Sequence, residues 1–131
     1  MDRIRRVALI LVALLVVGVF AASAEPVKIT YWQYFYQTKV DLINSLITQF
    51  QAQNPDIQVE QVTFPYESYN QKVAASIPAG EGPELINLFG GWQPMYVKAG
   101  YLQELPKADF APAYFKSTYY PFVADSVQFG G

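Results

Sequence analysis

The chain has 131 residues, a formal net charge of −2 at pH 7, and neither histidine nor cysteine. Without histidine it lacks the side chain that most often serves as a general base or a metal ligand near neutral pH. Without cysteine it has no disulfide bond and no thiolate metal site. Aromatic residues make up 16% of the chain. This composition is poor in catalytic side chains and favours a binding protein over an enzyme.

The first 24 residues have the layout of a secretory signal peptide. Three arginines form a basic start, an uncharged and mostly aliphatic run covers residues 7–22, and residues 22–24 read Ala-Ser-Ala. We expect cleavage after Ala24 and export to the periplasm. A retained membrane anchor is the alternative, but the aliphatic run is shorter than the ~20 residues that a spanning helix needs.

The mature part, residues 25–131, is mildly acidic. It keeps six lysines, no arginine and ten of the eleven acids, so its formal charge is 6 − 10 = −4. Nucleic acids and anionic membranes bind clustered Lys and Arg, so neither is expected as a partner. No cysteine follows the cleavage site, and we therefore expect a soluble protein rather than a lipoprotein.

The first two predicted elements are a strand and a helix. Val27–Tyr34 is β-branched and aromatic, which is typical of a strand. Thr38 begins the helix, with Asp41 three residues later as a variant capping box, and the helix ends before Pro55. One apolar stripe at helical spacing supports it: Ile43, Leu46, Ile47 and Phe50.

Two further strand–helix pairs follow in the same order. Residues 57–64 form a second strand, and apolar residues at helical spacing from Tyr66 to Ile77 indicate a second helix. Leu85–Phe89 is a short apolar run, as expected of a strand that is covered on both faces. Pro94 suits the first turn of a short third helix and Gly100 suits its C-terminal cap.

This alternation predicts an α/β fold with a mostly parallel sheet of strand order 2-1-3, flanked by helices. Beyond Tyr101 the pattern weakens, because Pro106, Pro112 and Pro121 interrupt a region rich in Tyr and Phe. No element is predicted there.

A ligand site is expected where the three strands end, because open parallel sheets bind ligands outside the carboxyl ends of their strands. Aromatic rings, amides and a pair of glycines occur at these ends. The candidate ligand-binding residues are Tyr34, Tyr36, Gln37, Tyr66, Phe89, Gly90, Gly91, Trp92 and Gln93, with Gln33 beside them.

These residue types suit a sugar. A pyranose has an apolar face of C–H groups and an equator of hydroxyls, so flat rings and amides match its two kinds of surface. The glycines let the backbone approach the ligand closely. No catalytic residue, metal site or cofactor is expected.

Five segments in order resemble a known family: "ITYW", "LITQFQAQNPDIQVE", "GEGPEL", "AGYLQEL" and "YYPFVADSVQFGG". Together they are similar to the extracellular solute-binding proteins of ABC importers, and most of all to the sugar-binding group that includes maltose-binding protein. The resemblance covers essentially the whole mature chain.

The resemblance implies two α/β lobes joined by hinge strands, a saccharide held in the cleft between them, and delivery to a membrane permease. Residues 25–131 then correspond to the amino-terminal part of lobe one, with the second lobe and the hinge largely missing, and a monomer is expected. The sugar contacts of the relatives carry over to Tyr34, Tyr36 and Gln37, and to Phe89–Trp92.

Three alternatives remain open. The same fold can bind a polyol, peptide, polyamine or anion, although polyamines need acids at the rim and anions need cations, and the predicted rim has few of either. A secreted carbohydrate-active enzyme needs two carboxyl groups about 5–9.5 Å apart, and Glu67 is the one acid at the predicted rim. A sensor that presents its ligand to a signalling receptor is the third.

Overall fold

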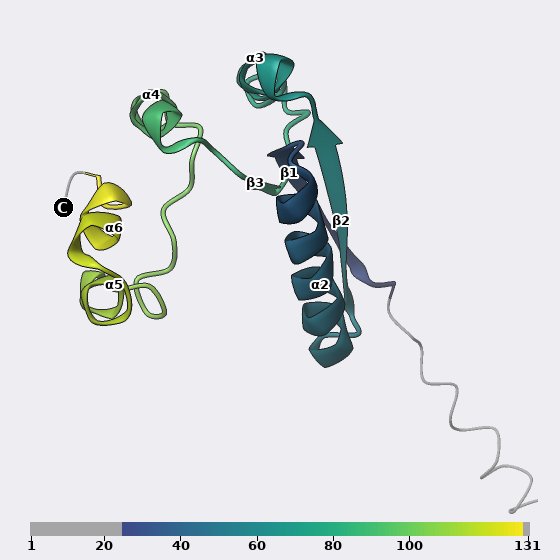
Figure 1. The fold of residues 1–131 in the computed structure, drawn as a ribbon, viewed down its shortest axis with the longest axis horizontal. Helices are drawn as coiled ribbons and strands as arrows, with labels where there is room; N and C mark the ends of the chain where they lie inside the picture. The colour runs from purple at the N-terminus through teal and green to yellow at the C-terminus, as the bar shows by residue number, and fades with distance from the viewer. Residues whose placement is uncertain (1–24, 130–131) are drawn as a thin grey trace, which may run out of the picture.

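The computed structural model describes residues 25–129, so the predicted signal peptide lies outside the described residues. Strands and helices alternate along the first two thirds of the described chain (Figure 1). In chain order the elements are β1 (Val27–Tyr34), α2 (Gln37–Gln53), β2 (Ile57–Phe64), α3 (Tyr66–Ser76), β3 (Leu85–Ile86), the 3₁₀ turn η1 (Gly90–Trp92), α4 (Gln93–Lys98), α5 (Pro112–Thr118) and α6 (Pro121–Ser126).

The three strands form one parallel sheet in the order β2-β1-β3, which confirms the predicted topology. β1 and β2 pair from Val27↔Ile57 to Tyr34↔Phe64. α2 runs alongside these two strands, and α3 lies at their carboxyl ends (Figure 1). The edge where the strands end is called the rim below.

The third strand is shorter and more exposed than predicted. Its pairing with β1 covers two residues, and the last bond of the ladder runs from the N–H of Asn87 to the carbonyl of Trp32 at 2.8 Å. Leu85 is 53% exposed, so the expectation of a strand covered on both faces is wrong. Among residues 25–129, no further strand pairs with the outer edge of β3.

A side chain continues the contact between β1 and the segment before β3. The Glu84 carboxylate accepts hydrogen bonds from the backbone N–H and the hydroxyl of Thr30, both at 2.7 Å. These bonds lower the pKa of Glu84, because they favour its charged form. Glu84 thus takes the place of a ladder carbonyl where β3 has not yet begun.

The core lies on the side of the sheet that faces α3 and α4. Tyr69, Val73 and Tyr96 are its fully buried members, and Trp32 and Phe64 of the sheet pack against them. The Tyr69 hydroxyl donates to the carbonyl of Trp32 at 2.7 Å. Burial raises the pKa of Tyr69, so its hydroxyl remains a donor at neutral pH.

α2 covers the opposite side of the sheet much less completely. It begins at Gln37 after Tyr36, and no side chain caps it, so the predicted capping box of Thr38 and Asp41 is wrong. Asp41 accepts a hydrogen bond from the Gln37 side chain instead. Of the predicted stripe, Ile43 and Ile47 are half-buried, whereas Leu46 and Phe50 are 49% and 42% exposed.

The end of the described chain contains two helices that the sequence did not predict. α5 and α6 both start at a proline. Proline suits the first helical turn because an N–H there has no acceptor within the helix, so the lack of one costs nothing. They lie side by side, away from the sheet and beyond α4 (Figure 1). Within residues 25–129, no helix is both long enough and apolar enough to cross a membrane.

Candidate ligand-binding site

Four of the predicted residues meet at the rim as a continuous series of rings. Tyr34 and Tyr66 pack edge to face with ring centres 5.1 Å apart, and Tyr66 stacks on Trp92 at 5.9 Å. Phe89 meets Trp92 edge to face at 5.7 Å. We call Tyr34, Tyr66, Phe89 and Trp92 the ring cluster.

The ring cluster rests on the buried core. The Tyr69 ring centre lies 5.7 Å from that of Tyr34 and 6.5 Å from that of Trp92. Tyr69 is fully buried, while Tyr66 and Phe89 are 47% and 50% exposed. The cluster therefore presents apolar surface to solvent from a well-packed base.

Local backbone bonds hold the ends of the strands and the turn that carries Trp92. The N–H of Phe35 donates to the Phe64 carbonyl at 2.7 Å, which keeps β1 and β2 paired up to the rim. The N–H of Trp92 donates to the Phe89 carbonyl at 2.8 Å and closes η1, and Pro94 then lies in the first turn of α4.

The two glycines of the turn have different roles. A Cβ on Gly91 would lie 2.8 Å from the Phe89 ring, so glycine is needed there for that ring to pack. A Cβ on Gly90 would meet nothing within 4 Å, and Gly90 does not have a positive φ. Gly90 thus leaves open backbone surface at the rim, as the predicted close approach of a ligand requires.

Two polar residues join the ring cluster that the sequence analysis did not select. Nζ of Lys39, in the first turns of α2, lies 2.9 Å from the Tyr34 hydroxyl and 3.2 Å from Oδ1 of Asn87. Asn87 follows β3 directly. A signal for each was present in the sequence: Lys39 lies near the start of a helix that begins at the rim, and Asn87 is the one strongly polar residue within Leu85–Phe89.

The other predicted residues do not join the ring cluster. Tyr36 is 64% exposed and has no ring partner among the described residues. The Gln37 side chain donates along α2 to Asp41 at 2.8 Å. Gln33 is fully buried, so it cannot contact a ligand at the rim; its amide donates to the Gln61 side chain.

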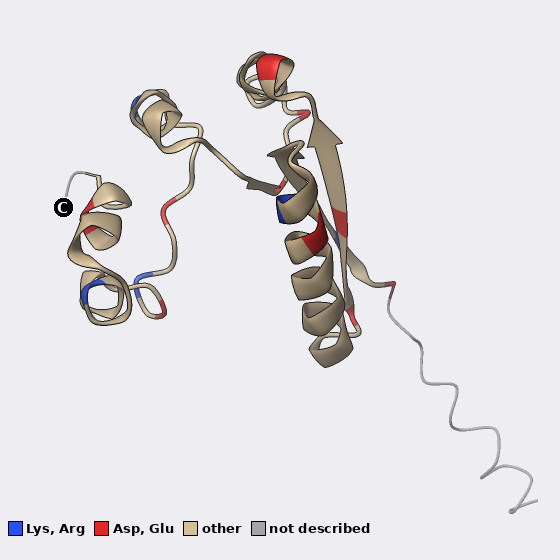
Figure 2. Cartoon of the chain, in the orientation of Figure 1, with Lys and Arg blue, Asp and Glu red and all other residues tan. Residues whose placement is uncertain are grey.

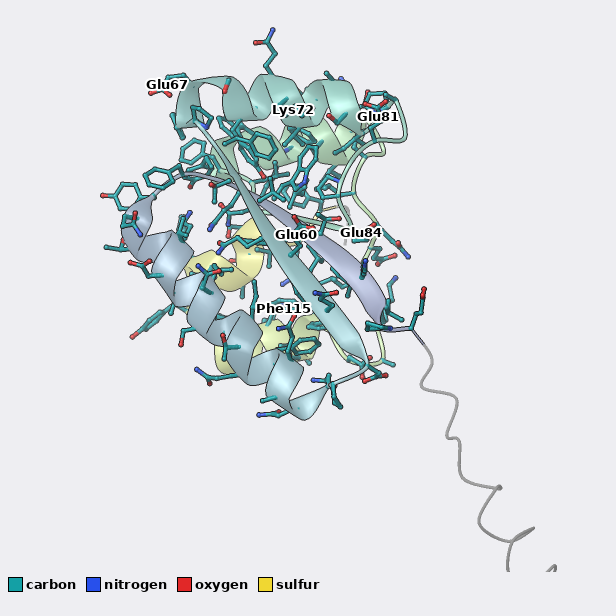
Figure 3. The ribbon with its side chains drawn as sticks, turned by 90° about the vertical axis from the view of Figure 1, so that its right-hand side faces the viewer. Glu60, Glu67, Lys72, Glu81, Glu84 and Phe115 are labelled. Carbon is teal, nitrogen blue, oxygen red and sulfur yellow. The ribbon has the colours of Figure 1, made fainter. Side chains whose placement is uncertain are left out.

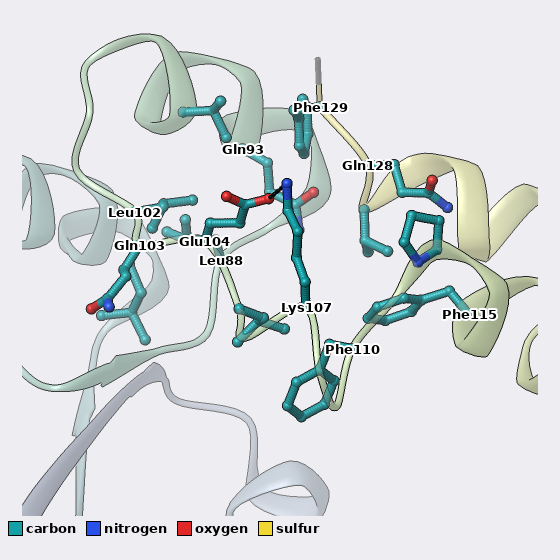
Figure 4. A pocket seen from close by; sticks show the side chains of 15 residues that line it. Leu88, Gln93, Leu102, Gln103, Glu104, Lys107, Phe110, Phe115, Gln128 and Phe129 are labelled. Atoms are coloured by element: carbon teal, nitrogen blue, oxygen red, sulfur yellow. Dashed lines mark ion pairs between the residues drawn. The ribbon is translucent and has the colours of Figure 1, made fainter. Parts of the chain in front are cut away.

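Gln93 instead lines a separate hollow of about 810 Å³ between β3, α4 and the α5–α6 pair (Figure 4). Most of the lining is apolar, with contributions from Ile86, Leu88 and Leu102, and none of the ring cluster takes part. The exposed ion pair of Glu104 and Lys107, 3.1 Å long, lies at this hollow (Figure 4). No residue of β1 or β2 lines this hollow. Open parallel sheets bind their ligands outside the carboxyl ends of their strands, and the rim is therefore the better candidate site.

The rim does not hold a pair of carboxyl groups. Glu67 lies at one end of α3 and Glu81 lies beyond the other end (Figure 3). Within residues 25–129, no three His, Cys, Asp or Glu side chains are grouped so as to hold a metal ion. What the rim offers is apolar ring surface beside hydrogen-bond donors and acceptors, which is suited to binding.

The chain resembles known proteins in sequence and in fold. Residues 36–128 match the family of bacterial extracellular solute-binding proteins. None of the curated proteins in the comparison matches the chain.

Several solved structures share the fold. An ABC substrate-binding protein from Listeria monocytogenes, solved with cycloalternan, is 27% identical with a TM-score of 0.67, over 81% of this chain. The GacH receptor of Streptomyces glaucescens, solved with acarbose, is 22% identical with a TM-score of 0.67, over 81% of this chain. The galacto-N-biose-/lacto-N-biose I-binding protein of Bifidobacterium longum is 24% identical with a TM-score of 0.65, over 82% of this chain.

The matched part is 27% of the length of each of these three proteins. The family match covers well over half of the present chain, and the parallel sheet of order β2-β1-β3 is shared with the solved structures. The chain belongs to the family of bacterial extracellular solute-binding proteins, which are binding proteins and not enzymes.

Proposed function

We propose that the chain is part of the substrate-binding component of an ABC-type sugar importer, which captures a saccharide at the rim and delivers it to permease subunits in the membrane. Family membership supports the role in solute uptake. Three structural relatives were solved in complex with a saccharide or a saccharide-like inhibitor, which favours a sugar over other solutes.

The observation that carries the proposal is the ring cluster. Covering about 100 Å² of an apolar sugar face contributes about 2.5 kcal/mol at about 25 cal/mol per Å². Each hydroxyl hydrogen bond adds only about 1 kcal/mol net, because it replaces a bond to water. The ring surface is therefore the largest single contribution to the affinity, while Lys39, Asn87 and the backbone at Gly90 select among sugars by their hydroxyls.

In this proposal residues 1–24 are a cleaved signal peptide and the protein works as a periplasmic monomer without a lipid anchor. Residues 25–131 form the amino-terminal part of lobe one. The chain matches 27% of the length of its relative from Listeria monocytogenes, and in this proposal a second lobe supplies the opposite wall of the cleft. No metal or other cofactor takes part.

Isothermal titration of the full-length protein against a panel of solutes tests the proposal. The panel contains neutral and acidic mono- and oligosaccharides, polyols, short peptides, a polyamine and inorganic anions. We expect heat of binding with at least one saccharide and recovery of that saccharide intact. Binding of a peptide, polyamine or free anion without binding of any saccharide would show that the protein takes up another class of solute. Cleavage of an oligosaccharide would show that it is an enzyme.

A further inference from the structure

Lys39 is a half-buried cation without a carboxylate partner in the described part of the chain. The one ion pair found within residues 25–129 joins Glu104 and Lys107, at the separate hollow. The partners of Lys39 are neutral: the Tyr34 hydroxyl and the Asn87 side-chain oxygen. A lysine ammonium has three N–H donors, and these contacts use two of them. One donor and the full positive charge are left for another group.

The surroundings of Lys39 add to its positive potential. α2 carries one basic residue and one acidic residue, both in its first turns (Figure 2). The acidic residue, Asp41, accepts from the Gln37 side chain. The first turn contains no acid and no side-chain cap, so the partial positive charge of the helix end is not neutralised by the helix itself.

This charge lies against the ring cluster. Lys39 Nζ is 4.2 Å from the centre of the Tyr34 ring, and Tyr34 packs against Tyr66, which stacks on Trp92. A sugar ring that lies on Tyr66, the neighbour of Tyr34, therefore has the Lys39 cation near one edge. A charge that is partly removed from water without a counter-charge is costly, and an arriving anion relieves that cost. A hydroxyl relieves it less, because a hydrogen bond between two charged groups is stronger than one to a neutral acceptor.

We propose that the site selects acidic saccharides, in which a uronate-type carboxylate pairs with Lys39 while the sugar ring lies on the ring cluster. The inference rests on the proposed saccharide-binding function and narrows its substrate class. The neutral amide of Asn87, directly after β3, holds the ammonium in place from one side, and the Tyr34 hydroxyl of β1 holds it from the other. Lys39 is the specificity-determining residue of this arrangement.

The test uses matched disaccharides that differ only in C6, as a carboxylate or a hydroxymethyl group, in both the gluco and the galacto series. Full-length protein is titrated calorimetrically with each pair at low and at high salt. We expect the acidic member to bind more tightly by about tenfold or more, since one partly buried ion pair separates the two. High salt should reduce that preference, because it screens the ion pair.

Variants of Lys39 test whether this residue causes the preference for the acidic disaccharide. Lys39→Gln should abolish the preference for the acidic member by weakening the acidic member more than the neutral one, since it removes the charge and keeps a donor. Lys39→Arg should retain the preference. Lys72→Gln is the matched control: its ammonium also lies near a ring, 5.5 Å from the centre of Trp32, but on α3 away from Lys39. It should leave both affinities unchanged.

The outcomes separate this inference from the proposed function. If neutral members bind as tightly as acidic ones, or if Lys39→Gln weakens both members equally, the inference is overturned and the saccharide role stands. A preference that persists in Lys39→Gln also overturns it. If neither member of any pair binds and the wider panel contains no binding saccharide, the proposed function fails, and the inference fails with it.

Discussion

On one side of the sheet α3 buries Tyr69 and Val73 completely, whereas on the other side α2 buries none of its residues. The first side also holds Tyr96 of α4, whose hydroxyl donates to the Asn70 side chain at 2.8 Å. The second leaves Leu42 58% exposed. The chain is therefore packed from one side of its sheet.

This difference decides which rim residues are held in place. The ring cluster lies over Tyr69, so its rings are fixed by contacts with the packed side. Tyr36 and Gln37 precede or begin α2, and no core residue supports them. A site that binds by ring surface needs rings in fixed positions, because each side chain ordered on binding costs about 0.5–1.5 kcal/mol. We therefore expect the largest contribution to the binding affinity to come from the ring cluster, which is packed over Tyr69 of α3, and little from Tyr36 and Gln37.

The largest effect on stability is expected from a substitution in the core on the α3 side of the sheet. Tyr69→Ala should lower the free energy of unfolding by about 3–5 kcal/mol, because it leaves a cavity beneath the rings. Leu42→Ala on α2 should cost less than about 1 kcal/mol, as for an exposed position. Urea unfolding of the full-length protein measures both. Equal losses would mean that α2 is as well packed as α3 in the whole protein.

A smaller effect is expected at the end of α4, the helix that carries Tyr96. Gly100 has a φ of +71°, and the N–H groups of Gly100 and Tyr101 donate back to the carbonyls of Val97 and Tyr96. Gly100→Ala should cost about 1–2 kcal/mol, because an L-residue is strained in this conformation.

Gly90→Ala is the matched control for Gly100→Ala. The new methyl group at Gly90 meets nothing within 4 Å and the backbone is not in the left-handed region. Its unfolding free energy should change by less than about 0.5 kcal/mol. Thermal or urea unfolding distinguishes the two, and similar losses in both variants would contradict the role given to the left-handed turn.

The smallest effect concerns pH and the junction between β1 and β3. The pKa of Glu84 is lowered from its ordinary value of 4.5 by its bonds to Thr30. A group with a depressed pKa in the folded state stabilises the fold above its unfolded pKa, and that contribution is lost as the pH falls through the folded pKa. Stability should therefore fall on acidification below about pH 4.5.

Glu84→Gln isolates this contribution, since the amide oxygen still accepts from Thr30 but does not titrate. The urea midpoint of the variant should depend less on pH between about 5 and 3 than that of the parent protein. An unchanged pH dependence would show that the Glu84–Thr30 contact does not contribute to the acid sensitivity of the fold.

Much of the fold could be predicted because the hydrophobic pattern sets it locally. β1 and β2 have the predicted bounds, and the stretch from Tyr66 to Ile77 buries Tyr69 and Val73 as its spacing indicates. β3 was predicted less well, because a short apolar run shows the tendency to be buried but not which neighbours are present to cover it. α5 and α6 were missed because their prolines read as interruptions, when each proline begins a helix.

The candidate site could be predicted only where backbone position decides the outcome. Tyr34 ends β1, Tyr66 begins α3 and Trp92 ends η1, so each lies where its element meets the rim, and the parallel topology brings them together. Gln33 was misplaced because alternation along β1 points it under α2. Lys39 was missed because the reach of a long side chain across to Asn87 depends on tertiary geometry, which local sequence does not contain.

The most direct test of the central claim is the affinity of two ring variants of the full-length protein for its best saccharide ligand. Trp92→Ala removes a ring of the supported cluster, and Tyr36→Ala removes an exposed ring without a partner. We expect Trp92→Ala to lose about 2 kcal/mol of binding free energy, more than tenfold in Kd, and Tyr36→Ala to change Kd by less than about threefold. Circular dichroism confirms that both variants are folded. Unchanged affinity in Trp92→Ala, or an equal loss in Tyr36→Ala, would contradict the account that the ring cluster holds the sugar.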